Sequence, residues 1–344
     1  MIRIKKQTLM SIGLVVLLCS CISSKEVKDE YVSLVPVDSL CSVVGIPTTM
    51  KLFDDKLFLV DMFNGESLIS VYDIKTKAKV FSFGEKGNGP EEFLQITSLD
   101  FSDKGNGQIE MLAFDPVRKQ CSIYNYQHLL NGNRNKEKSL NIAASVPYLY
   151  ELYKLNKGYI ATGRLEKDKY VLFSDSLEVS DYKGEYRPKP MKGIPDVLHS
   201  LANYGKTEFS LDKKKMVEIV YNASVLSMYD VNLDNIAKRW EYVIDELDYK
   251  VIDGSINKKS VMGYLSAYVG DRYVYALYSG KPENLDEIAT YGDEIHVLDY
   301  DGKMVERIKI ERPAFSLAVD ESENKIFTLC HIPETMVFVY DYER

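Results

Sequence analysis

The sequence has few of the side chains that usually hold metals or perform covalent chemistry. Its 344 residues include four histidines, one tryptophan and five cysteines. No histidine has a second ligand at zinc-site spacing, and no Cys-x-x-Cys pair occurs. The Gly-x-Ser-x-Gly sequence that carries the nucleophile of many hydrolases is absent too. We therefore expect no cofactor and no metal, and we predict no catalytic residue.

The sequence also lacks an apolar run of the ~20 residues that cross a bilayer. The run Leu9–Cys19 is shorter and follows the basic residues Arg3, Lys5 and Lys6. A positive start before a short apolar run is typical of a secretory signal, which is removed from the mature protein. The run therefore predicts export rather than a membrane span.

The end of this run resembles a bacterial lipobox. In Leu18-Cys19-Ser20-Cys21 a small residue precedes a cysteine, and a leucine stands three places before that cysteine. This predicts a signal peptide over residues 1–20, lipidation of Cys21 with acyl chains such as palmitate, and a polar tether over 21–30. The alternative is an ordinary signal peptide with two incidental cysteines, although no Ala-x-Ala-like site lies nearby.

Positive charge is in deficit. The chain has 43 lysines and arginines against 51 acidic residues, and its net charge is −8. A nucleic-acid partner would favour a basic face, so we expect none.

One short phrase recurs six times. Each copy has a bulky apolar or aromatic pair followed by Asp, Asn or Ser and a polar turn. The copies are Val71–Asp73, Ile123–Asn125, Leu172–Asp175, Met228–Asp230, Val297–Asp299 and Val339–Asp341. A period of about fifty residues is typical of propeller blades. The phrases predict third strands, with the aromatic filling the wedge between blades and the polar residue accepting N–H groups at the turn.

The residues around the phrases complete the blades. Short strand-like runs precede them as second strands, and six further runs are predicted to be first strands. These are Thr48–Phe53, Ile96–Phe101, Tyr148–Leu155, Phe209–Leu211, Ser260–Val269 and Ala314–Val319. Residues 31–344 are therefore predicted to form an all-β, six-bladed propeller. The last blade lacks a fourth strand, so Tyr31–Val37 is predicted to complete it and close the ring, because an unpaired edge would be left otherwise.

Two further expectations concern cysteines and loops. Cys41, Cys121 and Cys330 are either buried free thiols or include one bridge, from Cys41 to Cys330, if the N-terminal segment packs on the last blade. The irregular stretches 184–207 and 281–292 are expected to be long loops, the first with a short helix over Asp196–Ala202. The Lys213–Lys215 run is expected to be a solvated turn.

The Gly84–Phe93 stretch has glycines in a pattern that a phosphate cradle could use. It has no Lys-Ser/Thr end and opens no helix, so a turn between blades, with Phe93 in the interface, is the interpretation. Together with the six phrases and the lipobox, this stretch resembles the TolB-like six-bladed β-propeller lipoproteins of Bacteroidota and the interblade loop of NHL-type propellers. The resemblance implies a fold and a place in the cell envelope, with a role in partner binding.

The loops between second and third strands should gather on one face of a propeller. They begin at Asp61, Asp115, Arg164, Tyr221, Tyr278 and His331. As a set these residues are candidates for binding a glycan, a peptide or an envelope protein. Individually, each is also explained as a polar residue that solvates a loop end.

We therefore expect a non-catalytic binding lipoprotein, anchored through Cys21 in the envelope of a Gram-negative bacterium, with the outer membrane as the expected location. A glycan-active lyase or hydrolase is the alternative, and a structural subunit of an envelope complex is a third reading. A catalyst would need an acid and a base within reach of one substrate position.

Overall fold

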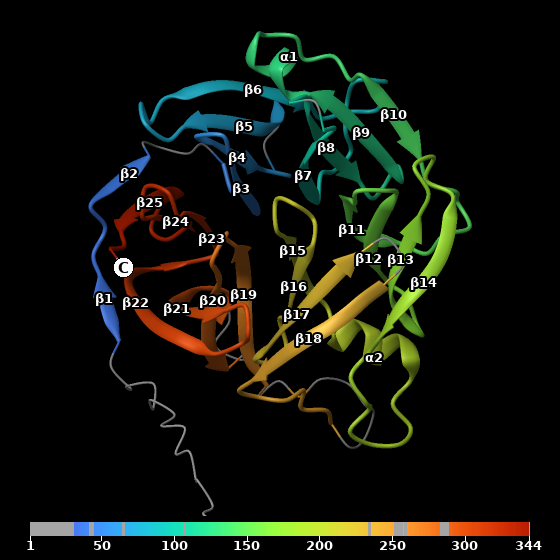
Figure 1. The fold of residues 1–344 in the computed structure, drawn as a ribbon, viewed down its shortest axis with the longest axis vertical. Coiled ribbons are helices and arrows are strands. Elements are labelled where there is room, and N and C mark those ends of the chain that lie inside the picture. The colour runs from blue at the N-terminus through green and yellow to red at the C-terminus, as the bar shows by residue number, and fades with distance from the viewer. Residues whose placement is uncertain are drawn as a thin grey trace, which may run out of the picture.

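The computed structural model describes residues 31–40, 45–63, 66–105, 107–232, 235–250, 257, 260–282 and 289–343. Six separate sheets stand around a common centre (Figure 1). In each, neighbouring strands are consecutive in the chain and antiparallel, apart from two N-terminal additions. The protein is thus an all-β six-bladed propeller, and the predicted fold is confirmed. The predicted signal peptide, Cys21 and the tether lie outside the described residues.

The first three blades have four strands each. Blade one contains β3 (Thr49–Phe53), β4 (Lys56–Val60), β5 (Ser67–Asp73) and β6 (Lys79–Glu85). Blade two contains β7 (Ser98–Asp103), β8 (Ile109–Asp115), β9 (Gln120–Asn125) and β10 (Lys138–Asn141). Blade three contains β11 (Leu149–Lys154), β12 (Tyr159–Gly163), β13 (Asp168–Phe173) and β14 (Val179–Glu185). Helix α1 (Tyr126–Leu130), which the sequence did not predict, follows β9, and Asn125 accepts a hydrogen bond from His128 N at its start.

The other three blades repeat this plan. Blade four contains β15 (Gly205–Phe209), β16 (Lys215–Val220), β17 (Val225–Asn232) and β18 (Asn235–Val243). Blade five contains β19 (Val261–Val269), β20 (Tyr273–Pro282), β21 (Gly292–Asp299) and β22 (Met304–Ala314). Blade six contains β23 (Ser316–Asp320), β24 (Lys325–Cys330) and β25 (Met336–Asp341). Helix α2 (Asp196–Ala202) lies between blades three and four and has the predicted bounds.

The recurring phrase is the third strand of every blade. Its polar end accepts turn amides where predicted: Asp73 Oδ1 accepts from Lys75 N at 3.0 Å and from Thr76 N at 2.7 Å. The hydrogen bond from Thr76 N, together with Lys56, lowers the pKa of Asp73 to about 2. The Asp299 carboxylate binds the amide of Lys303 in the same way, at 2.9 Å.

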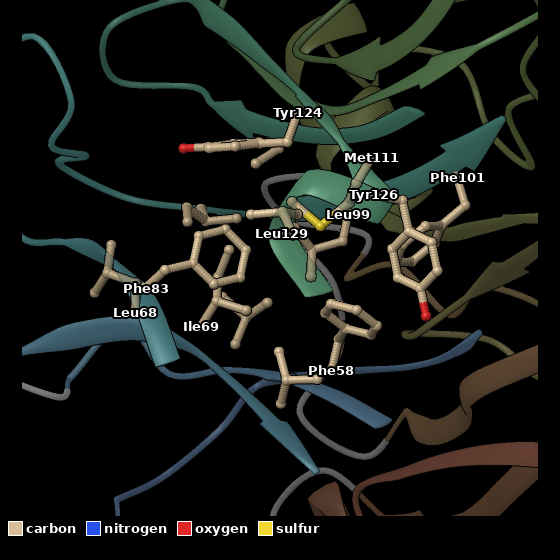
Figure 2. Close-up of a cluster of buried hydrophobic side chains, with 14 of the residues drawn as sticks. Phe58, Leu68, Ile69, Phe83, Leu99, Phe101, Met111, Tyr124, Tyr126 and Leu129 are labelled. Atoms are coloured by element: carbon tan, nitrogen blue, oxygen red, sulfur yellow. The ribbon is translucent and has the colours of Figure 1, made fainter. Parts of the chain in front are cut away.

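The bulky residue of each phrase lies at a boundary between blades. Six hydrophobic clusters each combine two neighbouring blades and contain one such side chain: Tyr72, Tyr124, Phe173, Tyr229, Leu298 or Tyr340. Figure 2 shows the cluster between blades one and two, where Tyr124 meets Phe83 edge to face at 5.4 Å. The predicted wedge is confirmed: one such side chain is buried in the cluster at each boundary between blades.

The residues that close the ring differ from those predicted. Strand β2 (Asp38–Leu40) pairs antiparallel with β25 and is the fourth strand of blade six. Strand β1 (Val32–Leu34) pairs in parallel with β22 and is a fifth strand of blade five. Pro36 explains the break, because it has no N–H with which to continue a ladder. The segment Tyr31–Val37 thus serves mainly blade five, and the closing strand begins after it.

The glycine-rich stretch turns between blades one and two as predicted. Phe93 is fully buried in the hydrophobic cluster between these two blades. Gly84 has a φ of +75°, which an L side chain rarely adopts. The loop's carbonyls face the Arg118 guanidinium, which donates to Gly87 O at 2.7 Å and Gly89 O at 2.9 Å. Carbonyl groups that hold a cation cannot cradle a phosphate.

The closing strand can be tested by stability. Leu40 is fully buried, so Leu40→Ala should lower the free energy of unfolding by roughly 2–5 kcal/mol. Val35, with 64 % of its surface exposed, is the control: Val35→Ala should change it by less than about 0.5 kcal/mol. Denaturant unfolding followed by circular dichroism measures both. Equal effects would contradict closure by β2.

Candidate functional site

One mouth of the central channel is hollowed into a cavity of about 600 Å³. The hairpins that join first and second strands surround it, and every blade except blade three contributes side chains. This volume is in the range of small-ligand sites. The site therefore lies on the face of the propeller where the chain turns from the first strand of a blade to the second.

Two lysines of this hollow are paired with carboxylates across the ring. Lys51 of β3 binds Glu208 of β15, and Lys213 in the β15–β16 turn binds Asp100 of β7. Figure 1 shows that hairpin reaching toward the centre of the ring. Lys213 is buried, so the predicted solvated turn is wrong for this residue and holds only for exposed Lys214. A buried lysine needs such a partner because an uncompensated charge is costly to desolvate.

The remaining charge of the hollow is negative. Seven carboxylates line it against the two paired lysines. Within the described chain, Asp54, Asp271 and Asp320 have no lysine or arginine partner within 4 Å. Asp54 accepts from Tyr126 Oη at 3.1 Å, and Asp320 caps its own turn through Ser322 N at 2.9 Å. These three come from adjacent blades, so their fields add on one side of the mouth.

Apolar side chains form part of the same wall. The rings of Phe53 and Phe101 stack at 4.3 Å, and Tyr126 meets Phe53 edge to face at 5.1 Å. Leu211, at the tip of the β15–β16 hairpin, leaves 65 % of its surface exposed, although it lies beside buried Phe209. The hollow therefore offers an apolar surface next to unpaired carboxylates.

Farther along the channel lies a smaller space of about 50 Å³, lined by Glu151 of β11 and by Lys206 and Thr207 of β15. Thr207 N donates to Glu151 Oε2 at 3.0 Å. Burial raises the pKa of the Glu151 carboxyl to about 7, against the lowering effects of Lys206 and that hydrogen bond. The space is large enough for a few water molecules and too small for a sugar or a peptide.

These polar inner strands explain one error in the strand assignment. Blade four was expected to begin at Phe209–Leu211, but its first strand is Gly205–Phe209. Lys206 and Glu208 face polar partners in the channel, so the strand has no simple apolar alternation to recognise.

The six residues predicted as binding residues lie at the opposite ends of the strands, and none lines the hollow. Asp61 and Asp115 are buried turn caps. Asp61 accepts from Ile46 N at 2.7 Å and Phe63 N at 2.8 Å, and Asp115 accepts from Leu94 N at 2.8 Å. Their carboxylates are thus occupied by backbone amides.

The other four do not form one cluster. Tyr221 belongs to a group of tyrosines on blades three and four, and Arg164 binds one member of that group, Tyr150. Tyr278 stacks on His296 at 5.0 Å, and Nε2 of His331 lies 2.9 Å from the Pro47 carbonyl oxygen. The pKa of His331 is lowered by burial. A role for these residues in ligand binding stays a prediction.

The sequence analysis did not identify the residues of the hollow. A signal was nevertheless present, because Asp54, Asp271 and Asp320 each lie at or just after the end of a first strand. In the described chain, no three His, Cys, Asp or Glu side chains are arranged to hold a metal ion. Cys121 and Cys330 are buried free thiols, whereas Cys41 lies outside the described residues.

The sequence matches the family model described as TolB-like 6-blade propeller-like over residues 25–322. The chain belongs to this family. Similar solved structures include a putative exported protein of Bacteroides fragilis, with a TM-score of 0.59, 12% identity and coverage of 90% of this chain and 94% of that one.

Other propellers are similar at the level of the fold. The Cps50 (Swd1) propeller domain of Myceliophteria thermophila has a TM-score of 0.53 and 10% identity, over 90% of this chain and 100% of that one. The RRP9 WD40 repeats have a TM-score of 0.54 and 8% identity, over 90% and 98%. No curated protein matches the sequence. None of the described helices has the length and apolar character to span a membrane.

Glu151 should make the stability depend on pH. Its pKa is about 7 in the folded protein and 4.5 ordinarily, so the folded state holds the proton more tightly. The contribution of Glu151 to the free energy of unfolding is fully present below pH ~4.5. It is lost as the pH rises through about 7, and the loss is on the order of 3 kcal/mol. Glu151→Gln should remove this part of the pH profile of the free energy of unfolding.

Glu178→Gln, at an exposed position, is the matched control and should keep the wild-type profile. Urea unfolding at intervals from pH 4 to pH 8 makes the comparison. Parallel profiles for wild type and Glu151→Gln would refute the assignment.

Proposed function

We propose that this protein is a non-catalytic binding protein of the cell envelope and that its hollow binds a peptide segment with basic and apolar side chains. The observation that carries the proposal is the combination of three carboxylates without a cationic partner and an apolar wall in one cavity of about 600 Å³. Lysine or arginine side chains would neutralise the carboxylates, and their neighbours would cover Phe53 and Leu211.

Binding is favoured over catalysis by the state of the central acids. Within the hollow, Asp100 and Glu208 are each held by a lysine. A general acid or base must be free to exchange a proton with a substrate. The carboxylates that are left at the rim provide charge for recognition.

The proposal includes a lipid anchor at Cys21 and location at the outer membrane. It is supported by the lipobox-like sequence and by the short distance along the chain from Cys21 to Val32, where β1 begins. A propeller tethered so closely would present its hollow to other envelope proteins.

The hollow can be tested with a labelled peptide, Gly-Lys-Leu-Lys-Tyr-Lys-Gly, by fluorescence anisotropy. The triple variant Asp54→Asn, Asp271→Asn, Asp320→Asn should weaken its binding at least tenfold, because the carboxylates would no longer attract the lysines. Added salt should weaken wild-type binding more than variant binding.

The control changes the same charge elsewhere. A second triple variant, Asp181→Asn, Asp230→Asn, Asp301→Asn, alters exposed carboxylates outside the hollow. It should leave the affinity for the peptide within about twofold of wild type. A peptide with Glu in place of Lys should not bind wild type. Equal weakening by both triple variants would show that only net charge matters and would overturn the proposed site.

The anchor is tested separately. Cys21→Ser should move the protein from the membrane fraction to the soluble periplasmic fraction and abolish metabolic labelling with palmitate, since the acyl chains hold it at the bilayer. Ser24→Ala, in the same segment, should change neither. Membrane retention of Cys21→Ser after a salt wash would contradict the lipid anchor.

A further inference from the structure

On the face opposite the hollow, four tyrosines form a continuous row across blades three and four. Tyr148 meets Tyr150 at 5.8 Å, Tyr150 meets Tyr204 at 4.5 Å, and Tyr204 meets Tyr221 at 5.3 Å. Tyr148 and Tyr204 leave 36 % and 40 % of their surfaces exposed. Burial raises the pKa of Tyr204 to about 12, so its phenol is neutral at physiological pH.

One cation lies at the end of this tyrosine row. Arg164 follows β12, its guanidinium lies 5.6 Å from the Tyr148 ring, and its Nε donates to Tyr150 Oη at 3.2 Å. Among described residues no carboxylate pairs with Arg164. Its terminal nitrogens are thus available to an anionic ligand, and the two tyrosine contacts fix the plane of the guanidinium.

A small pit of about 30 Å³ lies at the foot of the row, between blades three and four. Asn203 lines it and is buried. Its amide nitrogen donates to His199 O at 2.8 Å, whereas its Oδ1 has no hydrogen-bond partner. The Lys169–Glu218 ion pair also lines the pit and is neutral as a pair. The pit has room for one donor to this buried acceptor, which either a water molecule or a ligand hydroxyl group can supply.

We propose that the tyrosine row is a second binding site, for an oligosaccharide that carries carboxylates, such as a chain of uronic acids. Sugar rings would lie on Tyr148 and Tyr204, a carboxylate would bind Arg164, and a hydroxyl would donate to Asn203 Oδ1. A small inorganic anion would use the arginine alone and leave the aromatic surface uncovered, so it does not account for the row. The site is distinct from the hollow, since the two share no residue.

Calorimetric titration with hexagalacturonic acid tests the site, with its fully methyl-esterified form and maltohexaose as neutral probes. Wild type should bind the acid at least tenfold more tightly than either neutral hexasaccharide. Arg164→Ala should abolish this preference, and Arg164→Lys should keep only part of it, because lysine lacks the planar fork. Tyr204→Ala should weaken binding about tenfold, whereas Tyr204→Phe, which keeps the ring face, should stay within about twofold.

Tyr182→Ala and Arg272→Ala are matched controls, since both side chains are exposed away from the row. Neither should change the affinity. No binding of hexagalacturonic acid, or equal binding by Arg164→Ala and wild type, would overturn the proposal. Tyr204→Phe as weak as Tyr204→Ala would overturn the stacking role. The triple variant of the hollow should bind the acid normally, so failure of one site is distinguishable from failure of the other.

Discussion

The fold depends on the burial of one bulky side chain at every boundary between blades. A single four-stranded sheet has two faces and cannot cover either alone. The residue before the polar end of each third strand fills the wedge toward the neighbouring blade, and each such residue belongs to a different hydrophobic cluster. Because every wedge requires two blades, no blade is complete without both of its neighbours, and the ring must close.

Closure leaves a channel, and the channel determines the polar architecture. The inner strands face one another across a space that is partly removed from water. Charged pairs between blades, such as Lys213 with Asp100, solve this by satisfying each other. The two lysines of this mouth are thereby neutralised, so the carboxylates on the hairpins between first and second strands determine its electrostatic potential. The face with the tyrosines has a different character, with aromatic surface beside Arg164, for which no carboxylate partner lies among the described residues.

The repeated phrase made the fold predictable, because local turn chemistry and wedge filling are both encoded within three or four neighbouring residues. Helix α2 was predictable for a similar reason, with Pro195 directly before its first residue. The division of residues 31–40 into β1 and β2 was not, since it depends on which distant strand accepts each half. Blade four begins earlier than predicted. Its inner strand carries Lys206 and Glu208, which bind polar partners across the channel, so the strand lacks the apolar alternation by which a strand is recognised. The hollow was missed because Asp54, Asp271 and Asp320 are far apart in sequence and only the closed ring brings their hairpins to one mouth.

The two short N-terminal strands join the chain to different blades, β1 to the edge of blade five and β2 to that of blade six. A protein held at its N-terminus feels any pull on its body at this place first. Tension along β1 would load the three residue pairs of its ladder with β22 together, in shear, before it reached β2. Under such a load β1 would detach from blade five first, while the pairing of β2 with β25 kept the ring closed.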